Sequence, residues 1–254
     1  MTVLEARALA VAVPGRVLFR GLDLILEAGQ SWGLLGANGI GKTTLLHTLA
    51  GLRPAAAGEV CLEGVRLQQL DRKALARRIG VLFQDSRDTF PATVLETVMG
   101  GRYPHLPLWG GETAEDLRRA GEALERVALA PLQHRRIDTL SGGERRRLAA
   151  ALLLVQAPDI LLLDEPVNHL DLHHQITLLS LFTEQAAHGR ALLMSLHDVN
   201  LVLRFCSHAL LLIDDHTLVA GPAAEVVTAA NLERLYHHGI REVRDAGRRF
   251  YFPE

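Results

Sequence analysis

Gly36-Ala37-Asn38-Gly39-Ile40-Gly41-Lys42-Thr43 is the stretch that decides the fold of this 254-residue chain. It fits the pattern G-x-x-x-x-G-K-[ST], and it lies between a predicted strand, Ser31–Leu35, and a predicted helix, Thr43–Ala50. Glycines in such a loop let backbone N–H groups curl around phosphate oxygens, and the helix N-terminus adds positive potential. An ordinary glycine turn is the alternative, and the strand–loop–helix context favours a phosphate-binding loop.

The lysine in this loop stands out against the composition of the chain. Of 27 basic residues only two, Lys42 and Lys73, are lysines, and the other 25 are arginines. A compact ammonium group can reach the β- and γ-phosphates of a nucleotide in a way that a planar guanidinium fork cannot. Lys42 is therefore predicted to contact phosphate, and the Thr43 hydroxyl is predicted to ligate Mg²⁺.

Around the loop, short apolar runs alternate with helical patterns, which predicts an α/β fold with a mostly parallel sheet. The predicted strands are Leu22–Glu27, Ser31–Leu35, Ile79–Phe83, Ile160–Leu163, Ala191–Ser195 and Ala209–Ile213. Strand signals vanish over 91–156, where apolar residues keep helical spacing. We expect a single domain, 1–254, in which a helical subdomain (91–156) is inserted into an α/β core (1–90 and 157–254). A short helix and a hairpin are expected from Asn231 onward.

Composition narrows the class of protein. Hydrophobic residues make up 48% of the chain and charged residues 22%, which excludes a disordered chain. The net charge of −2 gives no support for a nucleic-acid surface. Two cysteines, Cys61 and Cys206, cannot form a disulfide framework, so a reducing compartment is expected. The longest apolar run, Leu148–Val155, is too short to span a membrane, and no basic segment indicates a secretory signal.

A second group of candidate residues follows the predicted strand Ile160–Leu163. The strand ends in two carboxylates, Asp164 and Glu165. Beside a phosphate-binding loop, Asp164 can serve the metal ion and Glu165 can polarise an attacking water. The alternative is a strand end capped by two solvated acids.

Leu140-Ser141-Gly142-Gly143-Glu144 precedes a helix-prone stretch. A Ser-Gly-Gly turn that opens a helix can bind an anion, and Ser141 with Glu144 also fits a capping box, S-x-x-E. Both interpretations can hold together. The chain therefore has two candidate phosphate-binding sites but one phosphate-binding lysine. This favours a pair of copies that share nucleotides between them.

Together these motifs resemble the nucleotide-binding subunit of an ATP-binding cassette (ABC) transporter, over nearly the whole chain. Gly36–Thr44 match the Walker A motif, Asp164 with Glu165 match Walker B, and Leu140–Glu144 match the signature LSGGE. The resemblance implies an ABC-ATPase fold with an N-terminal antiparallel β part, and ATP and Mg²⁺ as ligands. It also implies a head-to-tail homodimer, with each ATP between the loop 36–44 of one copy and Ser141, Gly142 and Gly143 of the other.

The resemblance assigns further roles. Gln84 falls in the glutamine loop, which links the site and its metal to the membrane partner, and Asn168-His169-Leu170-Asp171 matches the D-loop. His197 matches the switch histidine that contacts the γ-phosphate. The expected catalytic residues are therefore Lys42, Gln84, Glu165 and His197, and the expected metal ligands are Thr43, Gln84 and Asp164.

Two less specific segments narrow the family. Thr93–Val98 with Gly101–His105, and the tail Asn231–Tyr236, resemble the importers for iron–siderophores, haem and vitamin B12. This implies two separate permease subunits, an indirect substrate-binding protein, and a place at the cytoplasmic face of the cell (inner) membrane. The alternative for the first segment is a loop of the helical subdomain whose sequence reflects packing alone. A soluble cassette, as in iron–sulfur assembly, and an ATP-sensing module without turnover remain alternatives for the chain.

One position departs from the family pattern. ABC cassettes usually stack adenine on an aromatic residue before the second strand, and Val13 stands there in this chain. Phe19 is near in sequence but does not align with that position. We therefore expect loose discrimination between nucleotide bases, with affinity carried by phosphate and metal contacts.

Overall fold

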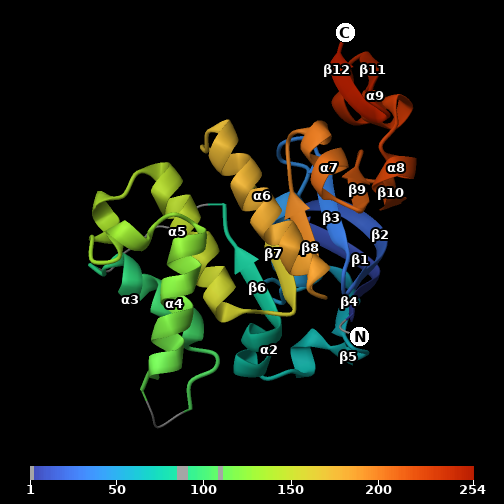
Figure 1. Cartoon of the computed structure of the whole chain (residues 1–254). Helices are drawn as coiled ribbons and strands as arrows, with labels where there is room; N and C mark the ends of the chain where they lie inside the picture. The colour runs from blue at the N-terminus through green and yellow to red at the C-terminus, as the bar shows by residue number, and fades with distance from the viewer. Residues whose placement is uncertain (1–2, 85–90, 108–110) are drawn as a thin grey trace.

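A six-stranded sheet forms the centre of the computed structural model, which describes residues 3–84, 91–107 and 111–254 (Figure 1). Its strand order is β10-β9-β3-β8-β7-β6, and all neighbours are parallel except the pair β10–β9. The strands are β3 (Ser31–Gly36), β6 (Ile79–Leu82), β7 (Ile160–Leu163), β8 (Ala191–Ser195), β9 (His208–Leu212) and β10 (Leu218–Pro222). Because parallel strands point the same way, the segments that follow β3, β6, β7 and β8 meet at one edge of the sheet.

The parallel strands are apolar on both faces, and successive residues enter two different cores. In β7, Leu161 and Leu163 pack into one cluster, with helices that include those of the 91–156 segment, while Ile160 and Leu162 pack into the other. This follows from the two-residue period of a strand. It explains why each of these strands reads as a continuous apolar run. The predicted strands are confirmed, to within a residue or two at most ends, with β2 starting earlier than predicted.

A second, antiparallel sheet covers one face of the central sheet with strand order β2-β1-β4-β5 (Figure 1). Its strands are β1 (Val3–Val13), β2 (Arg16–Glu27), β4 (Ala57–Leu62) and β5 (Val65–Arg66). The register of β1 with β2 shifts between Ala6 and Leu9, where Ala8 has a φ of 45°. The N-terminal antiparallel part expected from the family resemblance is thus present, together with the mostly parallel sheet.

Helices lie on the sheet faces and form a separate group beside the edge strand β6 (Figure 1). The α-helices are α1 (Lys42–Leu49), α2 (Arg72–Arg78), α3 (Val94–Met99), α4 (Ala114–Arg126), α5 (Gly142–Gln156), α6 (Leu172–Ala187), α7 (Val199–Phe205), α8 (Ala223–Val226) and α9 (Ala229–Tyr236). Short 3₁₀ turns are η1 (Leu67–Gln69), η2 (Gly100–Arg102), η3 (Ala130–Leu132) and η4 (Ile137–Thr139). Between 91 and 156, the described residues form helices, turns and one isolated bridge, Thr93 to Arg136. Residues 85–90, next to the expected boundary at 90, lie outside the described residues.

The C-terminal segment forms α9 and a hairpin, β11 (Ile240–Asp245) with β12 (Arg248–Pro253), as predicted. Tyr251 fixes the hairpin to the core, because its hydroxyl donates to the carbonyl of Val227 at 3.0 Å and its N–H donates to Asn200 Oδ1 at 2.9 Å. Asn200 belongs to α7, which follows the expected switch histidine. Among the described residues no helix is long and apolar enough to cross a membrane.

Candidate functional site

The loop between β3 and α1 has the backbone that a phosphate-binding loop requires. Gly39 and Gly41 have φ values of +78° and +116°, in the left-handed region where a side chain is strained. A Cβ on Gly41 would also lie 2.7 Å from Leu18 Cδ1. The chain therefore turns sharply from β3 into α1, and the N-terminus of α1 faces the sheet edge at which the candidate residues gather.

Lys42 is held inside this loop. Its side chain is buried, and Nζ donates to the carbonyls of Gly36 at 2.7 Å and Ala37 at 3.3 Å. Burial lowers the pKa of Lys42, and the nearby carboxylates of Glu165 and Asp164 partly oppose this shift. The ammonium thus lies close to both carboxylates, and its present acceptors are backbone carbonyls that a phosphate oxygen can replace.

Asp164 follows β7 and is completely buried. Its Oδ1 accepts a hydrogen bond from Ser195 Oγ at 2.8 Å, whereas Oδ2 has no hydrogen-bond partner among the described residues. A buried carboxylate oxygen without a partner is costly and is a feature expected of a metal ligand. Among the described residues no three His, Cys, Asp or Glu side chains gather as a metal cage. A carboxylate and the Thr43 hydroxyl suit Mg²⁺, which takes its remaining ligands from water and phosphate.

Glu165 is the centre of a polar cluster. Its Oε1 lies 2.8 Å from His197 Nε2, and its Oε2 accepts hydrogen bonds from Gln84 Nε2 at 2.9 Å and from Asn168 Nδ2. Three residues from three loops thus fix one nearly buried carboxylate. The structure brings Gln84, Glu165 and His197 together, as the assigned roles require.

The backbone of Glu165 is also unusual. Its φ is +48°, a left-handed conformation that is unfavourable for a residue with a side chain. Its N–H donates to Ser195 Oγ at 2.8 Å, so one hydroxyl serves Asp164 and Glu165 together. Such strained residues persist only where surrounding contacts hold them, and they concentrate at functional sites.

The turn Ser141–Glu144 forms the capping box. Ser141 Oγ accepts from the N–H of Glu144 at 3.2 Å, and Glu144 Oε2 accepts from the N–H of Ser141 at 2.7 Å. The hydrogen bonds that the Ser141 backbone N–H and side chain give to the carboxylate lower the pKa of Glu144. A Cβ on Gly142 would meet open space, and one on Gly143 would touch Leu170 Cδ2 at 3.3 Å. Among the described residues, no hydrogen bond or ion pair joins 141–143 to 36–44.

The expected adenine position offers no aromatic face. Val13 is half-buried and packs against the core beneath the antiparallel sheet. Phe19 is completely buried in the same core, so its ring is not available to a base. The structure therefore gives no substitute for the aromatic residue at this point of the sequence.

Two residues of the site were not predicted from the sequence. Ser195 ends the apolar strand β8, and a hydroxyl at the carboxyl end of a buried parallel strand was a signal that could have identified it. Arg146 is buried and donates to the backbone around Gln84 and Glu165. It stands in the run Arg145-Arg146-Arg147, and nothing in that run distinguishes the buried arginine from its neighbours.

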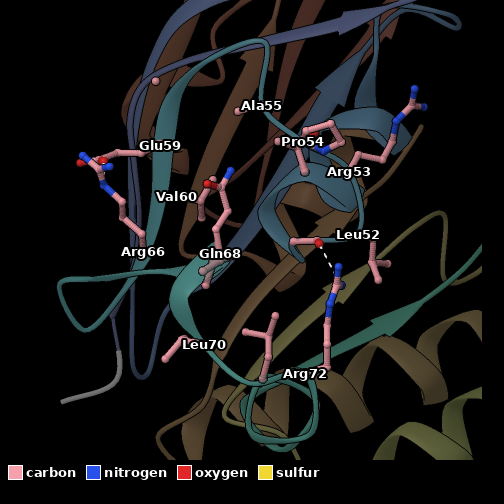
Figure 2. Close-up of a pocket in the computed structure, with 15 residues that line it drawn as sticks. Leu52, Arg53, Pro54, Ala55, Glu59, Val60, Arg66, Gln68, Leu70 and Arg72 are labelled. Carbon is pink, nitrogen blue, oxygen red and sulfur yellow. Dashed lines mark hydrogen bonds and ion pairs between the residues drawn. The ribbon is translucent and has the colours of Figure 1, made fainter.

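A cavity of about 430 Å³ lies away from this cluster (Figure 2). It is bordered by the segment that follows α1, by β4 and by η1, and Arg72 crosses it to donate to the carbonyl of Gly51 at 3.3 Å. None of the candidate nucleotide-binding or catalytic residues lines it.

Comparison with known proteins settles the family. A family model described as ABC transporter matches residues 19–168, more than half of the chain. This chain belongs to the ABC transporter family. The family resemblance and the ABC-ATPase fold expected from the motifs are therefore confirmed.

Relatives within the ABC family cover most of the chain. It is 41% identical over 221 residues to the ferric enterobactin transport ATP-binding protein FepC of Escherichia coli, covering 87% of this chain and 81% of FepC. It is 39% identical over 237 residues to the hemin import ATP-binding protein HmuV of Streptomyces coelicolor, covering 92% and 83%. Among solved structures, an inward-facing metal-chelate type ABC transporter has a TM-score of 0.85 at 26% identity, covering 100% of this chain and 98% of that one.

Proposed function

We propose that this chain is the ATP-hydrolysing subunit of an importer for an iron chelate (siderophore or haem) or cobalamin. The observation that carries the ATPase activity is the cluster in which Gln84, Asn168 and His197 hold the carboxylate of Glu165. The importer class is supported by relatives named for enterobactin, hemin and cobalamin transport.

The chain's own residues carry out the hydrolysis by position and charge. Lys42 and the N–H groups of 36–44 bind the phosphates, and the Glu165 carboxylate accepts the proton of the attacking water. His197, which is bonded to Glu165, contacts the γ-phosphate and orients the base. The donors Gln84 and Asn168 hold the carboxylate in place before the nucleotide arrives.

Asp164, Thr43 and Gln84 would hold Mg²⁺. When bound, the ion neutralises charge on the β- and γ-phosphate oxygens. The unpartnered Oδ2 of Asp164 supports this assignment.

The active unit is a head-to-tail homodimer in which Ser141, Gly142 and Gly143 of one copy bind the ATP held by the loop 36–44 of the other. The turn 141–143 carries no lysine of its own, which supports the sharing of one ATP between Lys42 of one copy and this turn of the other. The helical subdomain 91–156 carries the signature turn, and the core 1–90 and 157–254 carries the loop. Closure of the dimer drives two permease subunits, which receive cargo from a substrate-binding protein. Contact with the permease places the chain at the cytoplasmic face of the membrane.

The variant Glu165→Gln tests the proposed base, because glutamine keeps the size of the side chain but cannot accept the proton. We expect phosphate release to fall by about 10²- to 10⁴-fold, the usual contribution of a general base, while ATP binding is retained. With ATP and Mg²⁺, the variant should migrate as a dimer in size-exclusion chromatography. Glu225→Gln, at an exposed position, is the matched control. Unchanged turnover in Glu165→Gln contradicts the assignment.

Reconstitution with a permease of an iron-chelate, haem or cobalamin importer tests the transport role. ATP-dependent uptake of an iron–siderophore, haem or cobalamin into vesicles supports the importer class. ATPase activity that neither the permease nor the cargo changes indicates a soluble cassette instead. Binding of ATP without phosphate release in every reconstitution indicates a sensing module.

A further inference from the structure

Arg146 connects the helix of the signature turn to the catalytic edge of the sheet. It lies in α5, one turn after Gly142, and its side chain is buried. Its described hydrogen-bond acceptors include the backbone carbonyls of Phe83, Gln84, Asp164, Glu165 and Pro166. A guanidinium group has five N–H donors, and all three nitrogens of this one donate to carbonyls.

The acceptors belong to two loops that are far apart in the sequence. Nη1 donates to Phe83 and, at 3.2 Å, to Gln84, both in the loop after β6. Nη2 donates to Asp164 and, at 2.5 Å, to Glu165, and Nε donates to Pro166 at 3.1 Å, all in the loop after β7. One planar side chain therefore links the two loops, in addition to the pairing of β6 with β7.

These bonds surround the strained backbone of Glu165. The left-handed φ of +48° must be held by contacts on both sides of the residue. Ser195 holds its N–H from β8, and Arg146 holds its carbonyl from α5. The same guanidinium fixes the carbonyl of Gln84, whose side chain donates to Glu165 Oε2.

The neighbouring Arg147 shows that this connection is particular to one position. Its hydrogen bonds go to the carbonyls of Val127 at 2.8 Å and Ala128 at 3.1 Å, within the helical part of the chain. Both arginines bind backbone carbonyls, but Arg147 reaches none of the loop residues near Glu165 through these bonds. It is therefore the matched control for Arg146.

We propose that Arg146 is a positioning residue that couples the signature turn at the start of α5 to Glu165 and Gln84. The inference rests on the proposed ATPase function. When Ser141–Gly143 engage a nucleotide, any movement of α5 is passed to the backbone of both loops through this guanidinium. Arg146 thus acts on turnover through Glu165, without touching the substrate.

The test compares Arg146→Gln, Arg146→Lys and Arg147→Gln in the full chain, measuring kcat, KM and the Kd for ATP. Arg146→Gln should lower kcat by about 10- to 100-fold, the effect expected of a reacting group displaced by about 1 Å. KM and Kd should stay within about threefold, because the phosphate loop is untouched. Arg146→Lys, with three donors on one nitrogen, should recover part of kcat. Arg147→Gln should keep the wild-type kcat.

Three kinetic or binding results would overturn the proposal. They are a kcat within twofold of wild type in Arg146→Gln, a Kd that weakens as much as kcat falls, and an Arg147→Gln variant that is equally impaired. If Arg146→Gln does not fold, as judged by circular dichroism, Arg146→Lys decides by the same split between kcat and Kd. Should both fail to fold while Arg147→Gln folds, the role is structural and the proposal is wrong. Wild-type protein without phosphate release instead overturns the proposed function itself.

Discussion

Ser195→Ala should destabilise this protein far more than an ordinary serine substitution. The hydroxyl is completely buried, donates to Asp164 Oδ1 at 2.8 Å and accepts from the N–H of Glu165 at 2.8 Å. Alanine leaves two buried polar groups without this partner, at about 1–3 kcal/mol each. We expect a loss of about 3 kcal/mol or more in the free energy of unfolding. For a chain of this size that corresponds to a fall in Tm of about 6–12 °C.

Urea unfolding of the nucleotide-free protein, followed by circular dichroism, measures this loss, and differential scanning fluorimetry gives the shift in Tm. Ser180→Ala, at an exposed position on α6, is the control and should lie within about 0.5 kcal/mol of wild type. In an Asp164→Ala background, Ser195→Ala should cost about half as much, since one of the two orphaned groups is gone. A loss below about 1 kcal/mol in the single variant would refute the reasoning.

Two further predictions concern the helical region and the nucleotide base. Hydrogen bonds from Thr113 and the Arg102 guanidinium lower the pKa of Asp116 to about 2. Asp116→Ala should therefore lower the free energy of unfolding by about 1–2 kcal/mol at neutral pH. This difference from wild type should persist above pH ~4 and shrink as the pH falls through about 2, because Asp116 is protonated in both states only below its folded-state pKa; a pH-independent difference in urea melts contradicts the cause. Val13→Tyr should tighten ATP binding about 2- to 12-fold, the range for added aromatic stacking of 0.5–1.5 kcal/mol, in equilibrium titration. Wild-type protein should bind ATP and GTP with similar affinity, and a strong preference for ATP contradicts this expectation.

The central sheet could be predicted because its physics is local. Strands buried on both faces are uninterrupted apolar runs, as in Ile160–Leu163, and helices between them enforce parallel pairing. The strand Val3–Val13 was harder to locate, because the irregularity at Ala8 breaks its alternation of buried and exposed residues. The short strand Val65–Arg66 is exposed and carries no hydrophobic signal.

The candidate site likewise has a part that local sequence predicts and a part that it does not. The phosphate loop and the Asp164-Glu165 pair are contiguous in sequence, so their patterns predict them. The bonds from Gln84, Asn168 and His197 to Glu165 depend on how separate strands are ordered in the sheet, which short motifs do not encode. Family resemblance supplied those residues, whereas Ser195 and Arg146 needed the three-dimensional structure.

The left-handed backbone at Glu165 lowers the stability of the protein, whereas the side chain at the same position is needed for activity. Glycine adopts this conformation without the penalty of a side chain, which is about 1–2 kcal/mol, and asparagine adopts it more readily than glutamate. Selection for thermal stability alone would favour glycine or asparagine at this position and remove the carboxylate that acts as the base. A gene copy released from selection for turnover should therefore record that release first at position 165, as a more robust protein that no longer cleaves its nucleotide.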